Sequence, residues 1–181
     1  MNSPTLGLLL LIPLCTTNTM ADESMHEKTP AGEIVVLELP SRIAMEATSR
    51  SPYFQTNGTL FRKLFRYIDR NEIAMTTPVE AELQPGKMRF FVGSKDQNKE
   101  ISPTKEVKIV RMEPKTVVAI GIRGNYTEER FQANETKLRK WLGKNPKYVP
   151  AGDAYAVYWN GPFVPGMMKR SEIHIPVQAR E

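Results

Sequence analysis

The chain has 181 residues, 40% of them hydrophobic and 25% charged, which is enough for one domain with a sizeable core. Its 25 lysines and arginines exceed its 20 acidic residues, a basic excess that suits an anionic small ligand or an acidic membrane surface, and no nucleic-acid-binding motif is present. The only cysteine, Cys15, excludes a disulfide within the chain and a cysteine-based metal site.

The first predicted element is an apolar run over residues 6–14. It is too short for a transmembrane span but typical of the hydrophobic core of a signal peptide. Thr19 and Ala21 are small residues at the positions that favour cleavage after Ala21, so we expect residues 1–21 to be a signal peptide and the protein to be exported, periplasmic or associated with the cell envelope. Cys15 directly after the run leaves open a lipoprotein signal that ends before it, with a lipid anchor.

Residues 22–32 are polar and contain Pro30 and Gly32, so we expect a tether that leads to a domain over residues 33–178. Its first half is predicted to contain strands at 34–39 and 42–48, a helix at 59–68, strands at 79–83 and 87–92, and then a loop at 94–105.

The predicted helix has one apolar and one basic face. Its apolar residues at helical spacing are Leu60, Phe61, Leu64, Phe65 and Ile68, and its basic residues are Arg62, Lys63 and Arg66. The helix should end before residues 71–79, because Pro78 and the β-branched Thr76 and Thr77 favour extended backbone there. A connector between helix and strand is the simplest interpretation of this run.

The second half repeats the order of the first. Strands are predicted at 107–112, 116–122, 154–158 and 172–177, and a helix at 127–142 with Thr127 as its N-cap. Two strand-strand-helix-strand-strand units indicate an α+β fold, duplicated around one sheet or an open barrel.

Four stretches carry a resemblance to a known family. Residues 65–68 and 73–79 read FRYI and IAMTTPV, and residues 159–163 and 169–173 read WNGPF and KRSEI. This combination resembles the signature of the SOUL haem-binding protein family, and the resemblance extends from about residue 33 onwards. It implies a fold similar to the gyrase-inhibitor-like effector-binding domains, a bent antiparallel sheet or distorted open barrel with two helices packed on it and a ligand cleft between the halves.

Glu172 and His174 are two residues apart on a predicted strand, so their side chains point together, away from the side that carries Ile173 and Ile175. The alternatives are an exposed polar face and a functional pair. By the resemblance, Glu172 occupies the position of the glutamate that closes the effector-binding cleft. His174 is then a candidate metal ligand, for haem iron, because the other histidine, His26, lies in the expected tether.

The resemblance also suggests which other residues would bind a tetrapyrrole. Phe61 and Phe65 could stack on a flat macrocycle while Arg62 or Arg66 pairs with a propionate; the alternative is that both aromatic residues belong to the core. Three further residues are candidates for the rim of the cleft: Tyr158, Met167 and Met168.

The leading hypothesis is therefore a non-catalytic, exported binder of haem or another tetrapyrrole in an apolar cleft with a basic rim. The alternatives are a small hydrolase that uses Glu172 as a general base with a pKa raised by burial, a binder of organic cations through an ionised Glu172, and an envelope interaction protein with no small ligand. The sequence shows no Ser-His-Asp spacing, phosphate-binding glycine loop or cluster of metal ligands.

Overall fold

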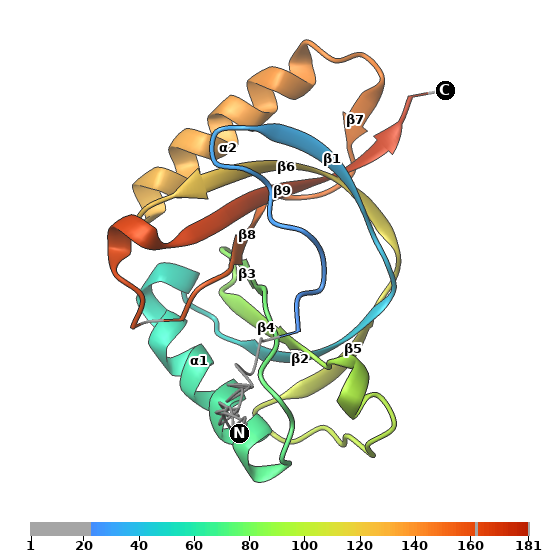
Figure 1. Cartoon of the computed structure of the whole chain (residues 1–181), viewed down its shortest axis with the longest axis vertical. Coiled ribbons are helices and arrows are strands. Elements are labelled where there is room, and N and C mark those ends of the chain that lie inside the picture. The colour runs from blue at the N-terminus through green and yellow to red at the C-terminus, as the bar shows by residue number, and fades with distance from the viewer. Residues whose placement is uncertain (1–22, 162, 181) are drawn as a thin grey trace, which may run out of the picture.

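The computed structural model describes residues 23–161 and 163–180 (Figure 1). The expected signal peptide, its cleavage site and Cys15 all lie outside the described residues. Within the described part of the chain, neither length nor apolar character would allow any helix to cross a membrane.

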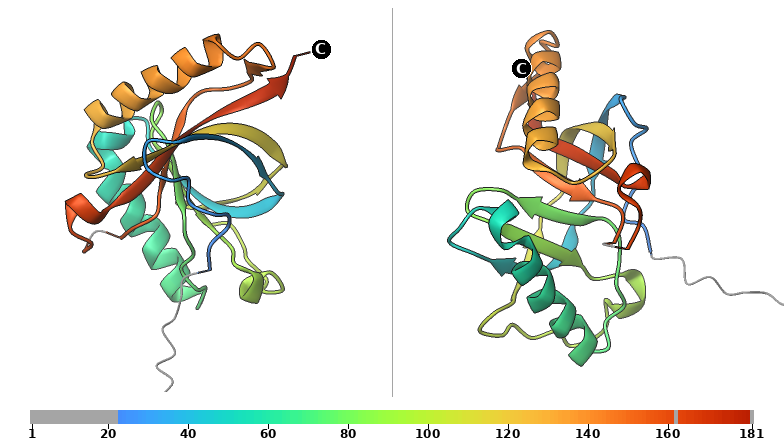
Figure 2. Two further views of the ribbon diagram at one scale, coloured as in Figure 1. Left: turned by 45° about the horizontal axis from the view of Figure 1, so that its top comes forward. Right: turned by 90° about the vertical axis from the view of Figure 1, so that its left-hand side faces the viewer.

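The molecule is a curled antiparallel sheet with two helices packed on one face (Figures 1 and 2). Eight strands follow each other in the order β1-β6-β9-β8-β3-β4-β2-β5, and β7 pairs with β9. The strands are β1 (Ile34–Leu39), β2 (Arg42–Thr48), β3 (Val79–Glu82), β4 (Lys87–Phe91), β5 (Lys108–Met112), β6 (Lys115–Arg123), β7 (Tyr148–Pro150), β8 (Tyr155–Tyr158) and β9 (Arg170–Ala179). This α+β half-barrel confirms the predicted fold class; of the two strand-strand-helix-strand-strand units, the second contains β7 in addition.

Helix α1 (Tyr53–Arg70) is longer than predicted, because it begins six residues before Thr59. Gly58 is a poor helix former, but the first turn is held by tertiary packing: Tyr53 is buried and its ring stacks on that of Tyr158, with centroids 5.9 Å apart. The helix ends at Arg70, and β3 begins directly after Pro78, as the sequence predicted.

Helix α2 (Glu128–Gly143) has the predicted boundaries within one residue. The Thr127 hydroxyl accepts a hydrogen bond from the backbone N–H of Arg130, and Glu128 and Glu129 place negative charge in the first turn. Two short 3-10 helices, η1 (Ser94–Asp96) and η2 (Gly166–Met168), and strand β7 were not predicted.

The two faces of the sheet differ because alternate residues of each strand point to opposite sides. The outer face, which the helices cover, carries apolar side chains that form the main core with those helices, among them Met45, Phe90, Val118, Ile173 and Ile175. The inner face, which lies inside the curl, carries charged and aromatic side chains, among them Arg42, Glu80, Arg89, Tyr155, Glu172 and His174.

Residues 23–33, which we call the N-terminal segment, run inside the curl rather than away from the domain (Figure 1). Ser24 bridges to Thr77, and Ala31 bridges to Gly121 of β6. A Cβ atom at Gly121 would stand 2.2 Å from the Pro30 carbonyl oxygen, so only glycine allows this close approach. The segment expected to be a tether is therefore packed on the inner face.

Candidate functional site

Glu172 is the polar centre of the inner face. One carboxylate oxygen accepts hydrogen bonds from the Thr29 backbone N–H (2.9 Å) and the Trp159 indole N–H (2.7 Å). The other accepts one from the Thr29 hydroxyl (2.9 Å) and lies 2.7 Å from Nε2 of His174. Burial opposes ionisation of Glu172, but the contact with His174, the nearby His26 ring and the Thr29 N–H together hold its pKa well below the usual range. Glu172 is therefore an ionised carboxylate, and the raised pKa that a general base would need is absent.

His174 is the predicted partner of Glu172, and the structure brings the two together in the middle of the molecule. Its side chain is fully buried, and Nδ1 lies 3.2 Å from the Tyr155 hydroxyl while Nε2 faces Glu172. Burial lowers the pKa of His174, which favours the neutral ring. With both ring nitrogens engaged and no exposed surface, His174 offers no open position to a macrocycle such as haem.

His26 joins this group from the N-terminal segment, although the sequence analysis had placed it outside the domain. Its Nε2 lies 3.8 Å from a Glu172 oxygen, and its ring contacts those of Trp159 and His174, with centroids 4.9 and 5.6 Å away. Both His26 nitrogens are buried and have no hydrogen-bond partner among the described residues. Nothing in the local sequence indicated this, because the two elements are separated by most of the chain.

Beyond Tyr155, the inner face continues as a network of ion pairs. The Arg42 guanidinium lies 2.9 Å from the Glu80 carboxylate, with both side chains almost fully buried, and it packs on the ring of Phe91. Arg89 lies 2.7 Å from Glu46 and also contacts Glu82. This network was not predicted, although the alternation of charged and apolar residues in β2, β3 and β4 was a signal for it.

The candidate residues of α1 lie elsewhere, on the outside of the molecule. The rings of Phe61 and Phe65 are stacked with centroids 5.8 Å apart, and Phe61 rests in turn on Phe90 of the core. Phe65 is 49% exposed, which is unusual for so large an apolar side chain. Arg62 and Arg66 are also on the surface, where Arg66 lies 3.9 Å from Glu106. Phe61 therefore belongs to the edge of the core, while Phe65 is available to a ligand.

The remaining predicted residues do not join Glu172. Tyr158 points to the outer face, where its ring contacts those of Tyr53 and Tyr126 and where burial raises its pKa. Met167 and Met168 lie in the loop between β8 and β9 and are 77% and 58% exposed. Figure 1 shows this loop and α1 on the same side of the molecule, away from the curl.

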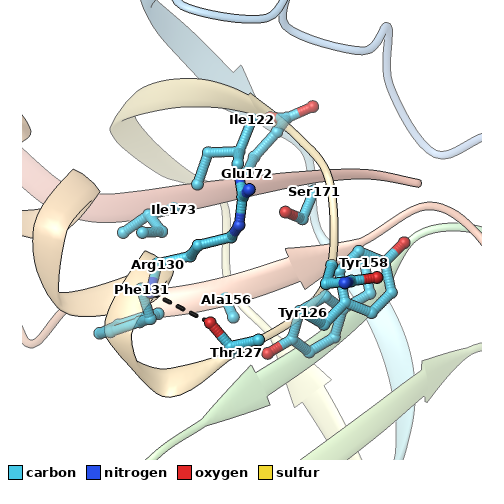
Figure 3. Close-up of a pocket in the computed structure, with 11 residues that line it drawn as sticks. Ile122, Tyr126, Thr127, Arg130, Phe131, Ala156, Tyr158, Ser171, Glu172 and Ile173 are labelled. Carbon is cyan, nitrogen blue, oxygen red and sulfur yellow. Dashed lines mark hydrogen bonds between the residues drawn. The ribbon is translucent and has the colours of Figure 1, made fainter. Parts of the chain in front are cut away.

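Two cavities of the described part of the chain are small. The one beside Tyr126, Tyr158 and Arg130 (Figure 3) has a volume of about 10 Å³, which is room for one water molecule. A second, of about 300 Å³, lies at the C-terminal end of α2 between Arg139, Tyr148 and Arg180, and reaches the lower limit for small-molecule pockets.

Comparison with known proteins agrees with the resemblance seen in the sequence. The family model described as "SOUL heme-binding protein" matches residues 30–176. The chain belongs to the SOUL haem-binding protein family. No curated protein matches the sequence.

Solved structures extend the SOUL likeness at the level of the fold. The crystal structure of the EcmrR C-terminal domain is similar with a TM-score of 0.64 and 16% identity, over 81% of this chain and 97% of that one. The crystal structure of a hydrolase from Listeria innocua has a TM-score of 0.56 and 10% identity, over 83% of this chain and 94% of that one. At these identities the likeness shows a shared fold and says nothing of shared chemistry.

Proposed function

We propose that this SOUL protein binds haem or another tetrapyrrole, without catalysis, on the exposed flank of α1. The observation that supports this most is the half-exposed ring of Phe65, stacked on Phe61 and flanked by Arg62 and Arg66. A flat aromatic ligand gains about 0.5 to 1.5 kcal/mol from such a stacking contact beyond the area that it buries. The two guanidinium groups would pair with its carboxylates.

The inner face fits a tetrapyrrole poorly. Its acidic centre, Glu172, already accepts hydrogen bonds from Thr29 and Trp159, and the N-terminal segment occupies the space in front of it. An anionic macrocycle would also have to approach an ionised carboxylate there. Because Thr29 covers the Glu172 carboxylate, an organic cation could reach that carboxylate only after displacing Thr29.

The loop between β8 and β9 supplies further apolar surface on the same side of the molecule as α1 (Figure 1). Phe163, Met167 and Met168 are all exposed there. Flexible methionine side chains can adapt to the edge of a ligand. We propose that this loop covers the edge of the macrocycle that α1 leaves open, so that iron ligation is not needed for binding.

Titration of the untagged protein with haemin, followed by the Soret absorbance, tests this proposal. The change Phe65→Ala should weaken binding by about 5- to 30-fold, which corresponds to one to two kcal/mol. The pair Arg62→Glu and Arg66→Glu should weaken it at least as much, because repulsion of the propionates replaces attraction. The spectrum should not change in His174→Gln as long as that variant is folded.

A matched control is the pair Arg139→Glu and Arg180→Glu, which makes the same change in net charge at the larger cavity. If this pair weakens binding more than the α1 pair, the α1 flank is not the site. If the wild-type protein does not bind haemin at micromolar concentration, the proposed function is itself wrong.

We further propose that the protein is exported, on the basis of the apolar run at residues 6–14. Determination of the N-terminal sequence of the mature protein would test this directly. A chain that begins after Ala21 supports an ordinary signal peptide, and a lipid-modified Cys15 supports an anchor. A mature protein that retains residues 1–14 would contradict both.

A further inference from the structure

We propose that His26, Glu172 and His174 form a binding site for one divalent transition-metal ion of the zinc type. The site would join the N-terminal segment to β9. It is separate from the α1 flank and does not depend on haem binding.

The potential ligand atoms of the three residues lie close together. One ligand atom from each of the three residues lies within 4.8 Å of the other two. The Glu172 oxygen that faces His174 at 2.7 Å is the same one that lies 3.8 Å from Nε2 of His26. Two ligands at about 2.0 to 2.1 Å from a tetrahedral zinc ion are about 3.3 Å apart, so the separations between the ligand atoms would have to change by roughly 0.5 to 1.5 Å to complete the site.

The His26 ring is buried without a hydrogen-bond partner among the described residues. Its two ring nitrogens are buried, and neither has a hydrogen-bond partner among residues 23–161 and 163–180. An unpaired buried imidazole is costly, because it loses its hydrogen bonds to water without replacement. A metal ion between His26 and Glu172 would supply the missing interaction.

The three side chains also have the chemistry that a metal ion of this type requires. Two neutral imidazoles and one carboxylate are a ligand set that divalent transition metals favour, with a fourth position for water. If Nε2 of His174 binds the ion, the ring proton moves to Nδ1, where the Tyr155 oxygen 3.2 Å away can accept it. The Glu172 oxygen that faces away from the ion remains held by Trp159 and the Thr29 N–H.

The clustering of His26, Glu172 and His174 was not predicted from the sequence. Glu172 and His174 lie on one strand face and were recognised as a pair. The third ligand comes from residue 26, whose segment was expected to be a tether. Metal binding would therefore fix the N-terminal segment on the inner face, since His26 is its contribution to the site.

The chain contains only two histidines, which makes the test direct. The untagged protein, free of haem and metal, is titrated with Zn²⁺ in competition with a chromophoric chelator, and with Co²⁺ to record the ligand-field spectrum. We expect one equivalent to bind, and a Co²⁺ spectrum of nitrogen and oxygen ligation. Zinc should also slow amide hydrogen exchange in the N-terminal segment.

The decisive variant is His26→Asn, because the His26 side chain makes no hydrogen bond to any residue that the structure describes. It should bind Zn²⁺ at least about tenfold more weakly and lose the zinc-dependent protection of the N-terminal segment. The control Glu27→Gln changes the neighbouring, exposed residue and should bind as the wild type does. Wild-type protein that binds no zinc, or His26→Asn that binds it unchanged, would overturn the proposal.

Discussion

The two faces of the sheet are buried equally well but by different means. The outer face excludes water with apolar side chains such as Val118 and Ile175, which are fully buried under the helices. The inner face buries Arg42, Glu80 and Glu172 just as completely, and each is matched with an opposite charge or with hydrogen-bond donors. Apolar contacts tolerate small shifts in position, whereas a buried charge depends on one particular partner.

This difference predicts where a substitution acts. On the outer face, the loss of unfolding free energy should increase with the apolar volume removed. On the inner face, it should depend on which charge or hydrogen-bond donor is left without a partner. The candidate ligand-binding groups are also divided. Glu172 and His174 lie on the inner face, whereas Phe65 and its basic neighbours Arg62 and Arg66 lie on the surface of α1.

The largest effect is expected for Glu80→Ala on the inner face. The Arg42 guanidinium would remain buried without its counter-charge, which costs about 3 to 5 kcal/mol of unfolding free energy. Urea unfolding of the variant measures this loss. The double change Arg42→Met with Glu80→Leu removes both charges and should recover most of the stability. If the double variant is as unstable as Glu80→Ala, loss of the counter-charge of Arg42 does not explain the instability of the single variant.

On helix α1, which covers the outer face, Leu64 and Phe65 are neighbours whose truncation to alanine should have different effects. Leu64 is fully buried, so truncation should cost about 2 to 5 kcal/mol. Phe65 is 49% exposed, and its truncation should cost less than about 1.5 kcal/mol. Thermal and urea unfolding of both variants tests whether Leu64 belongs to the core and Phe65 to the surface. Equal losses of unfolding free energy would place Phe65 in the core and would contradict its role as an exposed ligand contact.

Periodicity was enough to predict the outer face. The period of two in β9 placed Ile173 and Ile175 on the core side and Glu172 with His174 on the other, and the structure has this arrangement. The joint after α1 was also predictable, because Pro78 and its β-branched neighbours stop a helix locally. These features depend on residues that are close in sequence, so the pattern of side chains along the chain is enough to predict them.

The inner face could not be predicted in the same way, since its partners are far apart in the chain. Thr29 and Glu172 are separated by 143 residues, and a short polar stretch with proline and glycine has the composition of a tether whether or not it is packed. The early start of α1 was missed for a related reason: Gly58 argues against helix locally, and the burial of Tyr53 against Tyr158 overrides it.

On the inner face, the contribution of one hydrogen bond to Glu172 can be tested by changing a single side chain, that of Thr29. Thr29→Val preserves the shape of the side chain but removes the hydroxyl that donates to the carboxylate at 2.9 Å. Loss of a hydrogen bond to a charged group should lower the unfolding free energy by about 1.5 to 3 kcal/mol. Thr29→Ser keeps the hydroxyl and is the matched control. If both variants are equally stable, the Thr29 hydroxyl does not contribute to holding the N-terminal segment.

The smallest effect is expected at Asp96, which lies on neither face and holds the connector after α1. Its carboxylate accepts a hydrogen bond from the Ala74 backbone N–H at 2.8 Å and pairs with Lys99, also at 2.8 Å. The Lys99 ammonium group and then the Ala74 N–H lower the pKa of Asp96 below its ordinary value.

Because the pKa of Asp96 is lowered by folding, its contribution to stability is complete above the ordinary aspartate pKa and is lost as the pH falls through the folded pKa. Asp96→Asn keeps an oxygen for the Ala74 N–H but cannot pair with Lys99, so the wild type should be more stable at pH 7 by less than about 1 kcal/mol. Unfolding of both proteins in urea gives the difference between their unfolding free energies at pH 7 and at pH 3. The other carboxylates are present in both proteins, so their contributions cancel. The difference should shrink at pH 3; one that stays constant or grows would mean that the charge of Asp96 does not stabilise the connector.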